Sequence, residues 1–184
     1  MTALSTDLID SIRADMWHWL EDFVATKNAF YAGKFAPCPY ARAAINAHQV
    51  AVEVWTEGDV ARFIRAQSLT LVTSPEVSTL VMAFPPRTER KWGLTEFVET
   101  LNAELIPHDI FLNTGTTKTM ASRFTGSPPG TPYFIAVANR LGAVLTGSRA
   151  LMRTQYYFNW PPEQLELVVK RRARMAERFG HRVQ

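Results

Sequence analysis

The chain has 184 residues, of which 47% are hydrophobic and 20% are charged, a composition that excludes an intrinsically disordered chain. Its one cysteine excludes an internal disulfide, and no run of 18 apolar residues suggests a membrane span. The formal net charge is +3, and the N-terminal residues lack the pattern of a secretory signal, which predicts a cytoplasmic protein.

The first predicted element is a long amphipathic helix, because apolar residues recur at helical spacing from about Asp7 to Ala29. The alternation in HQVAVEVWT, which begins at His48, predicts a strand, and helical spacing follows Gly58. A second strand and helix are predicted next. The apolar run STLVMAFPP is typical of a strand, and a helix is predicted from Leu94 until Pro107 ends it.

The second half of the chain is less regular. Residues 107–131 are rich in Thr, Gly, Ser and Pro, which predicts one long functional loop. PYFIAVAN is then typical of a strand, and ALMRTQYYFNW is a further candidate for an extended segment. The last segment, PPEQLELVVKRRARMAERF, is predicted to form a helix whose first turn holds the prolines.

This order of elements predicts a single domain over residues 1–184 with an α+β fold, because strands and helices stop alternating toward the C-terminal end. The sheet is expected to be mostly antiparallel or mixed, with the helices packed mainly on one face. A doubly wound sheet is the alternative.

Much of the basic excess lies in the C-terminal segment KRRARMAERFGHR. Apolar residues keep helical spacing through Val168, Met175 and Phe179, so a solvated helix face is the preferred interpretation of these charges. A nucleic-acid-binding patch is the alternative, but no recognised nucleic-acid motif accompanies it. We therefore expect neither a nucleic-acid partner nor a membrane partner.

None of the four histidines has the close spacing that is typical of a zinc site. His108 differs from the others because it follows a predicted helix end, precedes Asp109 and opens the long loop. A carboxylate beside an imidazole can orient the ring as a metal ligand or a base. The preferred interpretation is nevertheless that His108 and Asp109 are ordinary turn residues at the start of a loop.

Cys38 lies between Pro37 and Pro39, which restrict the backbone on both sides of it. Packing as a small buried hydrophobic residue is the preferred interpretation, because free cysteine is among the most buried residue types. The alternative is a thiolate ligand or nucleophile whose pKa Lys34 and Arg42 would lower. A Cys-Pro pair is also a known way to present sulfur to haem iron.

Five short motifs occur in the same order as in the YqcI/YcgG family of small α/β proteins, which this chain resembles over roughly residues 17–165. They are FAPCPYARAA, LVMAFPP, FVETLNAELIPHD, GTPYFIAVAN and YYFNWPPEQL. The chain departs from the family pattern after His108, where the usual Trp-Pro and acidic stretch is missing.

That family includes haem-dependent enzymes of natural-product pathways, among them N-oxygenases that act on amino-acid nitrogen. The resemblance therefore implies a haem cofactor, with His108 as the axial iron ligand and Asp109 as the acceptor for its other ring nitrogen. It also implies that Arg123 and Arg149 pair with haem propionates or a substrate carboxylate, although arginines often serve only in surface pairing. Several aromatic residues are either walls of a cofactor slot or ordinary core: Tyr133, Phe134, Tyr156, Tyr157 and Phe158.

The expected function is a haem-dependent oxidoreductase of biosynthesis, an oxygenase or N-oxygenase-like enzyme acting on a small polar amine or amino-acid metabolite. One alternative is a noncatalytic module, either a haem carrier or sensor that uses Cys38 or a protein-interaction domain. Another is a haem-free thiol or acid–base enzyme in which the fold brings Cys38 and His108 together. His48 is a further candidate for the iron ligand, and the choice between a monomer and a homodimer stays open.

Overall fold

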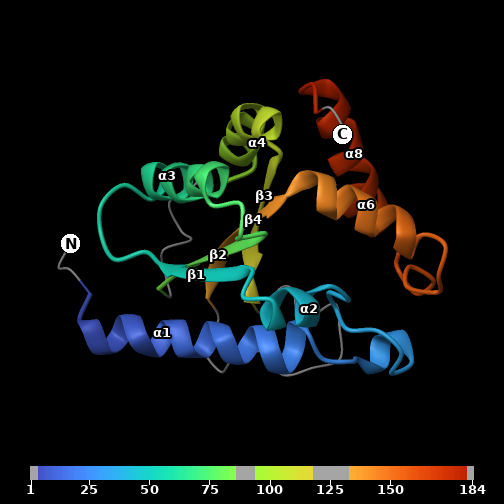
Figure 1. Cartoon of the computed structure of the whole chain (residues 1–184), viewed down its shortest axis with the longest axis horizontal. Helices are drawn as coiled ribbons and strands as arrows, with labels where there is room; N and C mark the ends of the chain where they lie inside the picture. The colour runs from blue at the N-terminus through green and yellow to red at the C-terminus, as the bar shows by residue number, and fades with distance from the viewer. Residues whose placement is uncertain (1–3, 86–93, 118–132, 182–184) are drawn as a thin grey trace.

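The computed structural model describes residues 4–85, 94–117 and 133–181, which form an α+β domain around a four-stranded sheet (Figure 1). The strand order is β1-β2-β4-β3. β1 runs parallel to β2, whereas β4 is antiparallel to both β2 and β3, so the predicted mixed sheet is confirmed and the doubly wound alternative is wrong. The strands are β1 (Val50–Val54), β2 (Thr79–Phe84), β3 (Ile110–Thr116) and β4 (Phe134–Arg140).

Two helices, α3 (Val60–Thr73) and α4 (Leu94–Leu105), cover one face of the sheet (Figure 1). α3 begins after Asp59, whose side-chain oxygen accepts a hydrogen bond from Arg62 N at 2.7 Å, as an N-cap residue does. Apolar residues three or four positions apart face the sheet in both helices. The core on this face includes Ile64, Leu71, Leu101, Leu105, Leu80, Met82, Phe84, Leu112 and Ala136.

The N-terminal helix covers the opposite face (Figure 1). α1 (Thr6–His18) continues directly into a π-helical turn, η1 (Trp19–Val24), so the predicted helix is confirmed and ends at Val24 rather than near Ala29. Because β2 is buried on both faces from Leu80 onward, both faces need a covering layer, and the helices are not confined mainly to one. The core on this second face includes Ile12, Met16, Trp19, Leu20, Phe23, Val52, Val54, Val81 and Ile135.

The C-terminal part forms a smaller third core with Phe111 of β3. The extended conformation expected for residues 150–160 is wrong, because Leu141–Leu151 forms α6 and residues 152–160 form turns. Aromatic residues favour strands only where they can pack against neighbouring strands of a sheet. The rings of residues 152–160 do not pack against the sheet. The last helices are α7 (Pro162–Leu165), the π-helical turn η5 (Glu166–Lys170) and α8 (Arg171–Arg178). No helix in the described ranges is long and apolar enough to cross a bilayer.

The loop predicted for residues 107–131 is wrong in its first part, because β3 begins at Ile110; residues 118–132 lie outside the described ranges. The second half of β3 is polar, as an edge strand permits, and this polarity hid the strand from the sequence prediction. Asn102 of α4 provides hydrogen-bond partners for backbone groups on the outer edge of β3. Its Nδ2 donates to Leu112 O at 2.9 Å, and its Oδ1 accepts from Leu112 N at 2.8 Å.

Candidate functional site

The histidine and aspartate predicted at the centre of a haem site have separate environments. His108 is exposed at the end of η4 (Ile106–His108). Asp109 has a positive φ of 61°, and its Oδ1 contacts His181 Nε2 at 2.7 Å and accepts a hydrogen bond from Gly142 N at 2.7 Å. Asp109 therefore ties His181, three residues beyond the end of α8, to the start of α6 rather than orienting the ring of His108.

The other residues predicted for haem lie on different elements. Tyr133 is buried, and its hydroxyl donates to Asp15 Oδ2 of α1 at 2.5 Å. Arg149 is exposed on α6, His48 is exposed just before β1, and Arg123 lies outside the described residues. Across residues 4–85, 94–117 and 133–181, no three His, Cys, Asp or Glu side chains gather as metal ligands. The described structure thus does not bring the predicted haem residues together.

Cys38 is exposed rather than packed in the core. Its segment runs from η1 toward the short helix α2 (Ala41–Asn46), and hydrogen bonds hold it on both sides. Cys38 N donates to Val24 O at 3.0 Å, and Ala41 N donates to Cys38 O at 3.1 Å. The hydroxyl of Tyr156 also donates to Pro37 O. A stiff segment with three such tethers fixes the position of the sulfur.

The surroundings of Cys38 favour the protonated thiol. Although the residue reaches solvent, the protein atoms around its sulfur withhold water, and this desolvation raises the pKa of the Cys38 thiol. Backbone N–H groups of Tyr40 and Ala41 donate to the sulfur, and they and the charge of Arg172 oppose the rise in pKa without cancelling it. The resting site therefore holds a thiol at neutral pH.

The two basic residues expected to activate Cys38 are engaged at the surface instead. Lys34 Nζ donates to Gln155 Oε1 at 3.0 Å, and Arg42 Nη2 donates to Glu21 O at 2.7 Å. The cation that lowers the pKa of the Cys38 thiol is Arg172, which lies far away in the sequence on the C-terminal helix.

An aromatic cluster joins the Cys38 segment to the turn at residues 152–160. Tyr156 is 4% exposed and stacks on Tyr31, with ring centroids 4.6 Å apart and planes inclined by 11°. Burial raises the pKa of Tyr31 to about 12 and raises the pKa of Tyr156 as well, so both hydroxyls stay protonated at neutral pH. Three further rings contact Tyr156 at centroid distances of 4.8 to 5.9 Å: Phe35, Tyr157 and Trp160.

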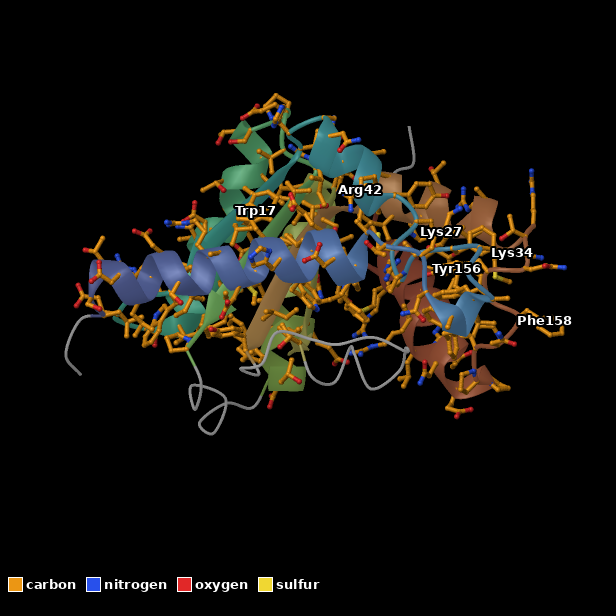
Figure 2. The ribbon with its side chains drawn as sticks, turned by 90° about the horizontal axis from the view of Figure 1, so that it is seen from below. Trp17, Lys27, Lys34, Arg42, Tyr156 and Phe158 are labelled. Atoms are coloured by element: carbon orange, nitrogen blue, oxygen red, sulfur yellow. The ribbon has the colours of Figure 1, made fainter. Side chains whose placement is uncertain are left out.

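The aromatic residues predicted as walls of a cofactor slot therefore have different positions. Phe134 belongs to the sheet core, whereas Tyr156 and Tyr157 belong to the aromatic cluster. Phe158 is 85% exposed, and Figure 2 shows it pointing away from the ribbon at the end of the molecule that carries Lys34 and Tyr156.

Arg172 of α8 reaches the neighbourhood of Cys38. Its guanidinium lies over the ring of Phe111, 5.4 Å from the centroid, and Nη1 donates a long hydrogen bond to Ser148 Oγ of α6 at 3.5 Å. Tyr157 interacts with the same Ser148. Burial raises the pKa of the Tyr157 hydroxyl, and Ser148 and Arg172 only partly oppose that rise.

Tyr40 connects the Cys38 segment to α6. Its hydroxyl donates to Gly147 O at 3.1 Å. A Cβ atom at position 147 would lie 2.7 Å from Tyr40 Cε2, so a glycine is needed for the ring to approach this closely. We refer to the resulting group as the Cys38–Arg172 cluster, which consists of Cys38, Tyr40, Ser148, Tyr157 and Arg172.

Both π-helical turns border this cluster. Val24, the last residue of η1, accepts the hydrogen bond from Cys38 N, and η5 ends two residues before Arg172. Single π-helical turns are rare and occur frequently at functional sites, because the extra residue redirects the side chains that follow. Their position is a second, independent reason to regard the cluster as the candidate site.

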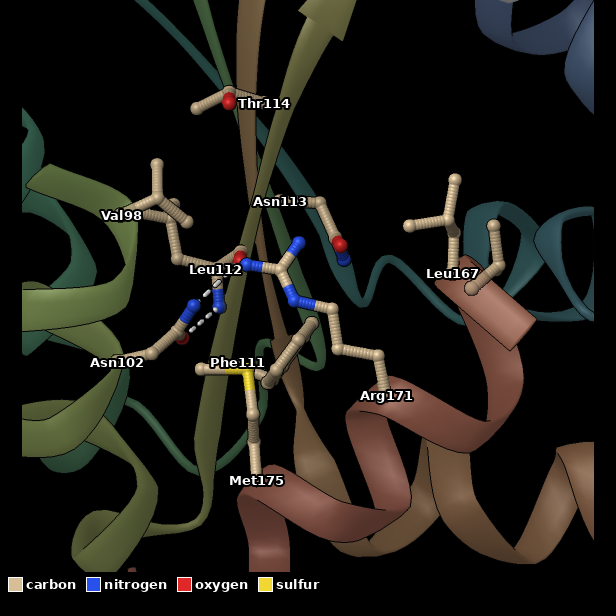
Figure 3. Close-up of a pocket in the computed structure, with 10 residues that line it drawn as sticks. Val98, Asn102, Phe111, Leu112, Asn113, Thr114, Leu167, Arg171 and Met175 are labelled. Carbon is tan, nitrogen blue, oxygen red and sulfur yellow. Dashed lines mark hydrogen bonds between the residues drawn. The ribbon is translucent and has the colours of Figure 1, made fainter. Parts of the chain in front are cut away.

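A separate cavity of about 220 Å³ lies between α4, β3 and α8 (Figure 3). Its polar side chains include Asn102, both ends of which are bonded to Leu112, and Arg171, which pairs with Glu99. None of the predicted site residues that the structure describes lines this cavity. The Cys38–Arg172 cluster is therefore the better candidate for chemistry, although the cavity is larger than one water molecule.

Sequence reasoning missed three members of the cluster, Tyr40, Ser148 and Arg172. One signal could have identified Arg172. It lies at helical spacing between Val168 and Met175, on the apolar stripe of the last helix, where a charged residue is unusual.

Compared with models of protein families, with curated proteins and with solved structures, the chain has no significant match.

Proposed function

We propose that this protein acts on a small-molecule ligand at the Cys38–Arg172 cluster. In this site the Cys38 thiol stays protonated and can donate its proton. The observation that carries the proposal is the placement of an exposed cysteine among polar side chains from four separate segments. Such convergence of side chains from separate segments is typical of a binding site built on a rigid scaffold.

The chemistry of the cluster is that of a donor-rich site. A thiol, a guanidinium and the hydroxyl pair of Ser148 and Tyr157 can donate hydrogen bonds to a ligand, whereas the proton of the Tyr40 hydroxyl is already donated to Gly147 O. No histidine or carboxylate is among the described groups that affect the pKa of Cys38, so the described residues provide no general base for it. The pKa of Glu104 is lowered mainly by its hydrogen bond from Arg65, and His108 makes only a minor contribution there. The cluster therefore favours binding and proton donation over nucleophilic attack.

Alkylation of native protein with iodoacetamide tests this proposal, because Cys38 is the only cysteine. The sulfur displaces iodide to form a thioether, and the thiol proton passes to the buffer. We expect one complete modification without unfolding, at a rate that is low at pH 7. The rate should keep rising with pH above about 8.5, the pKa of a free thiol, because the thiolate reacts and the pKa is raised.

Cys38→Ser is the control and should remain unmodified while keeping its circular dichroism spectrum. A thiol that reacts only at the rate of global unfolding would contradict the proposal, since the site would then be closed to ligands.

Haem-dependent oxidation is the second candidate function, and one observation favours a particular ligand for it. Cys38 is exposed beside a proline and receives backbone N–H groups from Tyr40 and Ala41, which would stabilise a thiolate bound to iron. His108 is also exposed, but no described residue donates a comparable hydrogen bond to its ring.

The visible spectrum of protein expressed with a haem precursor tests this second candidate. We expect a Soret band that Cys38→Ala abolishes and His108→Ala retains, with both variants folded by circular dichroism. Loss of the band in His108→Ala alone would return the ligand assignment to the histidine, and a wild-type protein without the band would reject haem binding.

A further inference from the structure

Arg172 is a partly buried cation without a carboxylate partner among the described residues. Its Nε atom is buried and makes no hydrogen bond to any described residue, and the contact of Nη1 with Ser148 Oγ is long. The next residue on the helix differs, because Arg171 pairs with Glu99 at the surface. The charge of Arg171 is thus balanced by a carboxylate, whereas the charge of the adjacent Arg172 is not balanced by any described carboxylate.

An uncompensated guanidinium is costly to bury, and arginine cannot avoid the cost by losing its proton. Burial lowers the pKa of Arg172, which reflects this cost. The ring of Phe111 compensates only part of the charge. The titratable groups that affect the pKa of Arg172, Tyr157 and Cys38, are neutral at pH 7, so the cluster keeps one net positive charge.

We propose that Arg172 binds the carboxylate of a small monoanionic ligand at the Cys38–Arg172 cluster. The two Nη groups of a guanidinium can donate two parallel hydrogen bonds to a carboxylate, and one hydroxyl of the hydrogen-bonded Ser148–Tyr157 pair supplies a further donor. One negative charge balances the one positive charge of the cluster. A dianion such as sulfate would leave an excess negative charge among partly desolvated neutral groups.

This inference rests on the proposed function in one respect, since it places the ligand beside Cys38. The experiment uses acetate as the probe and follows the alkylation of Cys38 by iodoacetamide, which is neutral. Acetate replaces chloride at constant ionic strength, so that general screening stays the same. We expect a saturable fall in the alkylation rate, because a bound carboxylate both covers the sulfur and disfavours its thiolate.

The variants Arg172→Met and Arg171→Met form a matched pair. Arg172→Met should weaken the apparent affinity for acetate by about tenfold or more, whereas Arg171→Met should leave it unchanged. Without acetate, Arg172→Met should melt at the same or a higher temperature, because an apolar side chain of similar length replaces a desolvated charge. Arg172→Lys keeps the charge but loses the planar fork, and it should have an intermediate affinity.

Two probes separate the ligand classes. Acetamide, which is neutral, should give no protection, and sulfate, which is a dianion, should protect less than acetate at equal concentration. Stronger protection by sulfate would overturn the assignment to a monoanion. Equal protection of wild type and Arg172→Met by acetate would overturn the role of Arg172.

Thermal stabilisation by acetate provides a readout that does not require Cys38 to react. If acetate raises the melting temperature of wild type and Cys38→Ser but not of Arg172→Met, the anion site exists even where alkylation fails. If alkylation proceeds but acetate neither protects nor stabilises, the anion site is rejected while the accessible thiol stands.

Discussion

Replacing Tyr156 with alanine is expected to lower the free energy of unfolding by about 3 to 5 kcal/mol, the range for large buried aromatic side chains. The ring is 4% exposed and stacks on Tyr31, and its hydroxyl donates to Pro37 O. Its removal leaves a void between the Cys38 segment and the turn at residues 152–160. Urea denaturation followed by circular dichroism measures the loss. Alkylation of Cys38 should also become faster in this variant, because one of its tethers is gone.

Tyr156→Phe is the matched control, since it keeps the ring and removes only the hydroxyl. We expect a loss of about 1 to 3 kcal/mol, which is the cost of leaving the Pro37 carbonyl without its donor. If the alanine and phenylalanine variants were equally unstable, the hydroxyl rather than the stacked rings would hold these two segments together.

Replacing Asn102 with alanine is expected to lower the free energy of unfolding by about 2 to 6 kcal/mol. The substitution leaves both the N–H and the C=O of Leu112 without partners, and each unsatisfied buried group costs about 1 to 3 kcal/mol. Asn102 and Leu112 are both almost completely buried, so bulk water does not reach these groups directly. Hydrogen exchange of the Leu112 amide provides a local measurement alongside urea denaturation.

Asn113→Ala is the control for this prediction, because Asn113 is the next residue of the same strand and is exposed. It should change stability by less than about 0.5 kcal/mol, as surface substitutions usually do. A small loss in Asn102→Ala, similar to that of the control, would mean that water from the adjoining cavity replaces the amide.

The sequence by itself predicted the elements whose patterns are strong and local. Alternation identified β1, a continuous apolar run identified β2, and helical spacing after Gly58 and from Leu94 identified α3 and α4. These patterns are readable because side chains three or four apart share a helix face and those two apart share a strand face. The α+β class followed from their order along the chain.

Local patterns failed where a segment depends on distant partners. β3 has a polar second half and is completed by Asn102 of α4, so its own sequence resembles a loop. The aromatic residues near Tyr156 favour a strand locally, but they form turns because Tyr31 and Trp160 receive their rings. Packing energy outweighs local preference in both cases, since β-propensity mostly reports how well a side chain fits its neighbours.

The candidate site shows the same division. The sequence determined that Cys38 would lie in a stiff segment, because two prolines restrict the backbone on either side of it. Only the tertiary structure decided that Arg172, rather than Lys34 or Arg42, is the cation that affects the thiol. The charge of a side chain is fixed by its chemistry, but its effect depends on distance and on the water that surrounding atoms exclude. Those two quantities exist only once α6, α8 and the Cys38 segment have packed together.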